Sequence, residues 1–115
     1  MAVTNLDNLS NMTGGDKDTM KQFIQLYLAD TPNLLGKLMA AYQNQSFQGV
    51  DSVQWCAHKI APQLGYMGMN STYDLAKKIE NDMNTNDHSM LLEDLAAMQE
   101  QIEKSYSELQ EFINI

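Results

Sequence analysis

Apolar residues recur at three- and four-residue intervals along almost the whole chain. The longest run of this pattern lies between His88 and Phe112 and comprises Leu91, Leu95, Met98, Ile102, Leu109 and Phe112. Because an α-helix turns about 100° per residue, this spacing places the side chains on one helical face. No segment resembles a strand. The sequence therefore predicts an all-α fold.

Turn and cap residues divide the first part of this pattern into two predicted helices. Asp16 can cap a helix that runs through Leu28. The pair Thr31-Pro32 is the strongest boundary in the sequence, because threonine suits the N-cap and proline suits the first helical position. A second helix is therefore expected from Pro32 to about Gln45.

Three more helices are expected after a break at residues 46–49. The third begins near Val50, and its expected core stripe is Val50, Val53, Ala57, Ile60, Leu64 and Met67. Ser71 and Asp74 can form a capping box that opens the fourth helix. The last helix is expected over residues 88–112.

The connections between these helices are short, which favours antiparallel neighbours. We therefore expect an up-down antiparallel four-helix bundle from Pro32 to the C-terminus, with the additional N-terminal helix packed across one end. Residues 1–15 are polar and rich in Asn and Gly, and we expect them to form a poorly structured arm. Residues 16–115 then form a single helical domain, since a chain of 115 residues supports one core.

The charge balance excludes several classes of partner. Seven basic against fifteen acidic residues give a formal net charge of −8, which repels nucleic acids and anionic membranes. No apolar run approaches the roughly 20 residues of a membrane span. The single cysteine, Cys56, cannot pair within the chain, so we expect a reducing, cytoplasmic environment and a structural thiol.

One of the two histidines, His58, occupies an unusual position in the third predicted helix. It points about 125° away from the centre of the core stripe. Its neighbours on that face are mostly short, which would let another protein approach the ring. We predict that they form a docking surface made of Gln54, Ala61, Pro62 and Gly65. Pro62 also leaves the His58 carbonyl without its usual donor, at a cost of about 3 kcal/mol in a helix interior.

The surroundings of His58 narrow the chemistry it could perform. No second histidine or cysteine follows at three or four residues, so no metal site is expected. Gly14-Gly15 is too short for a phosphate-binding loop. What remains is the imidazole as a nucleophile that carries a phosphoryl group, or else an ordinary solvated histidine. The second histidine, His88, has no obvious partner and is expected to be a surface residue.

Two sequence blocks and one downstream residue pair are typical of a known family. The blocks are 23-FIQLYLADTPNLLGKLMAAYQNQ-45 and 57-AHKIAPQLGYMG-68, and the pair is Ile79-Glu80. Together they resemble the histidine-containing phosphotransfer (Hpt) domain of two-component phosphorelays. Ala57-His58, Gly65 and Gly68 match the family's histidine block, while Phe23 and Tyr27 are candidates for its early aromatic residue. The family usually has lysine and glycine where this chain has Ala61 and Pro62.

The resemblance implies a role for several residues. His58 would be phosphorylated on Nε2, and Glu80 would orient the imidazole through Nδ1. Lys77 lies one turn before Glu80 and could supply the cation that Ala61 lacks. The protein would accept a phosphoryl group from a receiver-domain aspartate and pass it to another receiver.

The partners implied by the resemblance are response-regulator receiver domains and a hybrid sensor kinase. The protein would act as a monomer without ATP-binding or autokinase activity, and Mg²⁺ would sit on the receiver, so no cofactor of its own is expected. Three alternatives stay open: a degenerate module that docks without carrying phosphate, the dimerisation helices of a sensor kinase, and a helical adaptor unrelated to phosphorelay.

Overall fold

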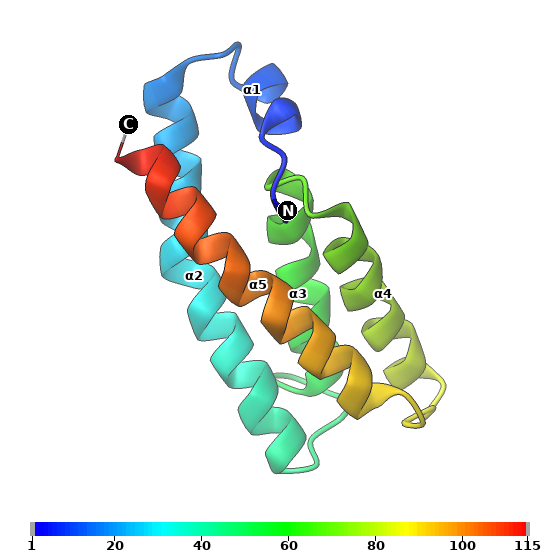
Figure 1. Cartoon of the computed structure of the whole chain (residues 1–115). Helices are drawn as coiled ribbons and strands as arrows, with labels where there is room; N and C mark the ends of the chain where they lie inside the picture. The colour runs from blue at the N-terminus through cyan, green and yellow to red at the C-terminus, as the bar shows by residue number, and fades with distance from the viewer. Residues whose placement is uncertain (1, 115) are drawn as a thin grey trace.

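Five helices make up the computed structural model, which describes residues 2–114. They are α1 (Asp7–Met12), α2 (Lys17–Gln43), α3 (Val53–Tyr66), α4 (Asn70–Asn84) and α5 (Leu91–Ile113). The described residues contain no strand, so the prediction of an all-α fold is confirmed. The chain turns back at each connection from α2 to α5 (Figure 1).

Helix α2 corrects the strongest boundary that the sequence predicts. It runs straight through Pro32, so the two helices expected on either side of Thr31-Pro32 are one. The buried residues of α2 form an uninterrupted stripe: Met20, Ile24, Tyr27, Thr31, Leu35, Leu38 and Ala41. Burying each large apolar side chain stabilises the fold by about 1.5–3 kcal/mol, which together outweighs the roughly 3 kcal/mol cost of an internal proline. Pro32 itself is exposed on the outer side.

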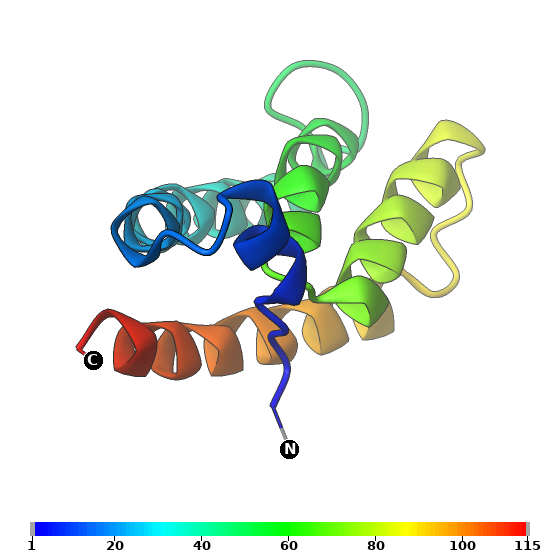
Figure 2. The same cartoon turned by 90° about the horizontal axis from the view of Figure 1, so that it is seen from above.

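The expectation of a poorly structured arm at residues 1–15 is wrong. These residues contain α1, whose Leu9 is fully buried in the core. An additional N-terminal helix therefore exists, but it is α1 and not the helix expected after Asp16. Seen from above, α1 lies across the end of the bundle beside α2 and α3 (Figure 2).

A short segment before α1 is fastened to two other parts of the fold. The Val3 and Thr4 amides donate to the two carboxylate oxygens of Glu108 on α5, at 2.8 and 3.0 Å. The Asn5 amide donates to the Met67 carbonyl at 3.0 Å. We call residues 3–5 the N-terminal strap. Sequence composition missed it because its anchors lie far away in the chain.

The connection between α2 and α3 is longer than expected. Helix α3 begins at Val53, where the Ser52 hydroxyl accepts a hydrogen bond from the Trp55 amide at 3.1 Å. Val50, placed in the core stripe by its spacing, is 78% exposed in this connection. The amide of Gln48 reaches across to the Met83 carbonyl at 2.6 Å and joins the connection to the end of α4.

The expected starts of the last two helices also shift. Helix α4 begins at Asn70 with no side-chain cap, so the predicted capping box is not formed. Helix α5 begins at Leu91, after His88. The His88 ring packs edge-on against Phe47 with its centroid 4.2 Å away. His88 thus supports the connection between α2 and α3.

The core lies between α2, α3, α4 and α5. In the view from above, α5 runs along one side of the other three helices (Figure 2). Helix α3 packs against both α2 and α4, and α5 completes the bundle by packing against the same two helices. The largest fully buried residues of the core are Leu9, Ile24, Leu38, Ile60, Leu64, Met67, Met69, Ile79, Met83, Leu95, Met98 and Ile102. This packing fixes α3 beside α4, where the candidate site lies.

Candidate phosphotransfer site

Helix α3 presents His58 on the side opposite its core face. Its buried residues are Val53, Cys56, Ala57, Ile60, Ala61 and Leu64. The His58 side chain is 62% exposed, which confirms that it points away from the core. Helix α3 continues through Pro62 without a break, so one rigid element carries the histidine.

Glu80 of α4 fixes one side of the His58 ring. Its Oε2 lies 2.7 Å from Nδ1 of the histidine. An ionised carboxylate can only accept hydrogen bonds, so the proton of the neutral imidazole is assigned to Nδ1. The lone pair is then on Nε2, the other nitrogen of an exposed ring. This arrangement can place a nucleophilic nitrogen toward a partner.

Lys77 occupies the second oxygen of the same carboxylate. Its Nζ lies 2.7 Å from Oε1 of Glu80, one turn along α4. Partial burial acts to raise the pKa of Glu80, but the hydrogen bonds from Lys77 and His58 outweigh it and hold this pKa below its ordinary value. The hydrogen bond to Glu80 in turn raises the pKa of Lys77. The carboxylate therefore stays ionised beside the imidazole.

A shallow hollow of about 390 Å³ opens beside the histidine. His58 and Glu80 line it together with Gly49, Val50, Gln54 and Trp55. Gln54 lies at its edge and donates a hydrogen bond to the side chain of Asn84 on α4. Sequence reasoning missed Val50 and Trp55 as site residues. The spacing could have identified the tryptophan, because a residue three positions before His58 lies on the same helical face.

The four residues predicted to form the docking surface have different surroundings. Gln54 is half-buried, and Pro62 is exposed. Ala61 is only 1% exposed, so its prediction as a docking residue is wrong. Because α2 and α4 both cover α3, they bury a wider arc of it than the stripe indicated. Gly65 is half-buried under the Tyr73 ring: a Cβ added there would lie 3.6 Å from Cδ2 of that ring.

Metal and thiol chemistry find no support in the described part of the chain. Residues 2–114 hold no group of three or more histidine, cysteine or acidic side chains able to bind a metal ion. Cys56 is fully buried, and burial raises the pKa of its thiol, which keeps it unreactive. Across the same residues, none of the helices has the length and apolar character of a membrane span.

Comparison with known families agrees with this geometry. The sequence model of the Hpt domain matches residues 22–112. The chain belongs to this family. Searches of curated proteins and of solved structures returned no match.

Hpt domains act in phosphorelays with the receiver domains of response regulators. The match to the Hpt domain includes the candidate site, because His58, Lys77 and Glu80 all lie within it. It leaves out α1 and the N-terminal strap.

Proposed function

We propose that this Hpt domain is a phosphorelay intermediate that carries a phosphoryl group on Nε2 of His58. The lone pair of Nε2 attacks the phosphorus of an aspartyl phosphate on a receiver domain. The nitrogen–phosphorus bond forms as the phosphorus–oxygen bond to the aspartate breaks, and the aspartate leaves as a carboxylate. The same step in reverse passes the group to the aspartate of a second receiver.

The contact between Nδ1 of His58 and Oε2 of Glu80 is the observation that carries this proposal. When Nε2 becomes bonded to phosphorus, the ring keeps its proton on Nδ1 and gains a positive charge. The neighbouring carboxylate stabilises that charge without moving. The exposed ring leaves Nε2 open to the receiver.

Lys77 acts in this proposal as the cation that replaces the family's missing lysine. Its ammonium group holds Glu80 in place and keeps it ionised, and it contributes positive charge next to the phosphoryl acceptor. Gln54, Pro62 and the hollow beside His58 contact the receiver.

The remaining features of the proposal concern the protein as a whole. Helices α2 to α5 form an up-down four-helix bundle that acts as a monomer in the cytoplasm. The protein needs no cofactor, since Mg²⁺ sits on the receiver, and it neither binds ATP nor phosphorylates itself. A hybrid sensor kinase supplies the group through its receiver domain.

The test is transfer from a labelled receiver. A receiver domain phosphorylated with radiolabelled acetyl phosphate and Mg²⁺ is mixed with the protein, and acid-labile label on the protein is measured. We expect label on the wild type and on His88→Ala, and none on His58→Ala. His88 provides the matched control because it is the other histidine.

The outcome also distinguishes a domain that carries the phosphoryl group from one that only binds the receiver. A degenerate Hpt domain, suggested by Ala61 in place of lysine, would bind the receiver and stay unlabelled. Binding without label on the wild type would therefore favour that second function and reject the carrier.

A further inference from the structure

Trp55, the only tryptophan, has the ammonium groups of two lysines near its indole ring. Nζ of Lys59 lies 5.3 Å from the centroid of the indole ring, and Nζ of Lys37 lies 5.8 Å from it. Both distances fall within the range of cation–π contacts. Two lysines from different helices thus gather over one ring that lines the hollow of His58.

Val50 also lines this hollow and is 78% exposed. The connection that carries it is held at both ends. The Val53 amide donates to the Ser46 carbonyl at 2.9 Å, and the Gln54 amide donates to the Phe47 carbonyl at 3.2 Å. Leaving an apolar side chain in water forgoes the roughly 1.5–3 kcal/mol that its burial would contribute. A fixed connection therefore presents an apolar side chain next to the nucleophile.

Charge around the hollow differs in sign from that of the whole chain. Three lysines contact residues that line it: Lys37 and Lys59 contact Trp55, and Lys77 pairs with Glu80. The carboxylates among these contacts are Glu80 and Asp51, which pairs with Lys37. The whole chain has seven basic and fifteen acidic residues. Positive charge is thus concentrated near His58.

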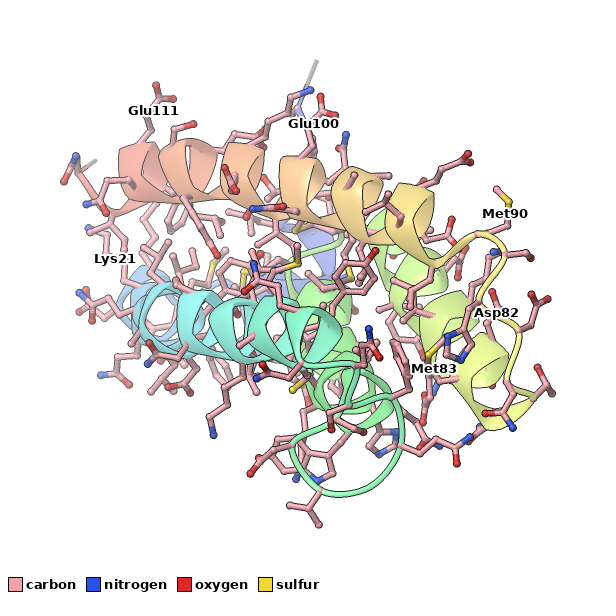
Figure 3. All side chains as sticks on the ribbon, turned by 90° about the horizontal axis from the view of Figure 1, so that it is seen from below. Lys21, Asp82, Met83, Met90, Glu100 and Glu111 are labelled. Carbon is pink, nitrogen blue, oxygen red and sulfur yellow. The ribbon has the colours of Figure 1, made fainter. Side chains whose placement is uncertain are left out.

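Two acidic side chains of α5 lie away from this hollow. The α5 side chains of Glu100 and Glu111 project from the far side of the molecule, across the bundle from the connection between α2 and α3 (Figure 3). The lysines beside His58 thus face a different side of the molecule from these two glutamates.

We propose that Lys37, Val50, Trp55 and Lys59 form a selectivity surface that recognises the receiver domain. The partner is a receiver whose face around its phosphorylated aspartate is acidic and carries one apolar side chain that enters the hollow. This proposal rests on the proposed function, because it concerns docking at the same histidine. It assigns partner choice to residues of α2, α3 and their connection that lie beside His58.

Charge complementarity favours an acidic receiver over a second copy of this chain. In a two-fold dimer built on this surface, the lysines of one copy would face those of the other. An acidic receiver instead meets lysines whose stems pack beside the indole and whose ammonium groups stay in water. Such contacts also accelerate association.

The test measures label transfer at increasing concentrations of a receiver that labels the wild type. For Lys37→Glu/Lys59→Glu we expect the receiver concentration at half-maximal rate to rise about tenfold. For Val50→Ser we expect a rise of about two- to fivefold. The matched controls are Lys17→Glu/Lys104→Glu, which makes the same change in net charge, and Leu92→Ser, which removes another exposed apolar side chain. These controls should stay within about twofold of the wild type.

Several outcomes separate this proposal from the one it rests on. An equal loss in both double variants, or none in either, overturns the selectivity surface while leaving the carrier function intact. Unchanged Trp55 fluorescence when the unphosphorylated receiver is added to saturation would also overturn the selectivity surface and leave the carrier function intact. Failure of the wild type to take up label overturns both proposals. Circular dichroism confirms that each variant is folded.

Discussion

Oε2 of Glu80 on α4 lies 2.7 Å from Nδ1 of His58 on α3, so the carboxylate and the imidazole belong to different helices. The packing of α3 against α4 therefore sets the orientation of the ring. A change that shifts either helix should alter the site even where it touches neither residue.

Removing the carboxylate should slow phosphoryl uptake. A hydrogen bond to a charged group contributes about 1.5–3 kcal/mol, so Glu80→Ala should reduce the rate of label transfer roughly 10- to 100-fold. Glu80→Gln should lie between this variant and the wild type, because its oxygen still accepts from Nδ1–H but carries no charge. ¹⁵N shifts of the imidazole should show the Nδ1–H tautomer weakened in the alanine variant. Wild-type transfer in Glu80→Ala would remove the carboxylate from the mechanism.

Lys77 should act through Glu80. In Lys77→Met we expect the pKa of the Glu80 carboxyl to move upward, since the hydrogen bond that helps to lower it is lost. Transfer should fall roughly two- to fivefold, as expected for an exposed ion pair. An NMR titration of the Glu80 carboxyl carbon measures the pKa. The control is Lys78→Met, which breaks contacts to Asp82 and Asp94 but none to Glu80.

The N-terminal strap should make stability depend on pH through Glu108. Partial burial acts to raise the pKa of Glu108, but hydrogen bonds from Thr4 and Val3 outweigh it and lower the folded-state value below the ordinary 4.5. Its contribution is therefore fully present above the ordinary value and is lost as the pH falls through the folded value.

The matched variant for this strap is Glu108→Gln. It should lower the free energy of unfolding by about 1–2 kcal/mol at neutral pH, and the difference from the wild type should shrink below about pH 4.5. Urea unfolding at several pH values measures this. A difference that stays constant down to pH 2 would contradict the role of the charge.

Two glycines near the end of α3 should respond in opposite ways to alanine. A Cβ at Gly65 would meet the Tyr73 ring at an ordinary contact distance, so Gly65→Ala should stabilise the protein by about 0.5–1 kcal/mol. Gly68 has a φ of 67°, and a Cβ there would overlap the Asn5 carbonyl. Gly68→Ala should therefore cost at least about 1–2 kcal/mol. Thermal unfolding of the two variants measures both changes in stability. Equal changes in Gly65→Ala and Gly68→Ala would contradict the prediction.

Pro32→Ala should raise stability, because Pro32 lies inside α2. The alanine regains the missing backbone donor and removes a steric clash, for a gain of about 1–3 kcal/mol in urea unfolding. Pro62→Ala in α3 is the companion variant and should gain for the same reason. If Pro32 began a helix, as its sequence context suggests, the substitution would bring no gain.

Short-range patterns predicted the helices of this protein better than their ends. Periodicity predicted that His58 points away from the core. The family resemblance indicated that Glu80, on the following helix, contacts it. The continuity of α2 could not be predicted from the sequence, because it depends on core packing along a stripe of residues that continues past Pro32. Ala61 was misplaced for a similar reason: the arc of α3 that is buried depends on how closely α4 approaches.

Contacts between distant parts of the sequence escaped prediction altogether. The strap needs Glu108, and the hollow beside His58 needs Val50 held by a connection whose shape local residues do not determine. Neither feature has a periodic signal in the sequence.

The strap also has a consequence for the order of folding. Its hydrogen bonds to Glu108 join residues 105 and 104 positions apart, whereas the neighbouring helices α3 and α4 are separated by a few residues. Closing so long a loop is entropically costly, so these bonds form only after the helices have assembled. They are then also the first to open. Amide hydrogens of Val3 and Thr4 should exchange with solvent well before those of α3, through an opening that leaves the histidine and its carboxylate in place.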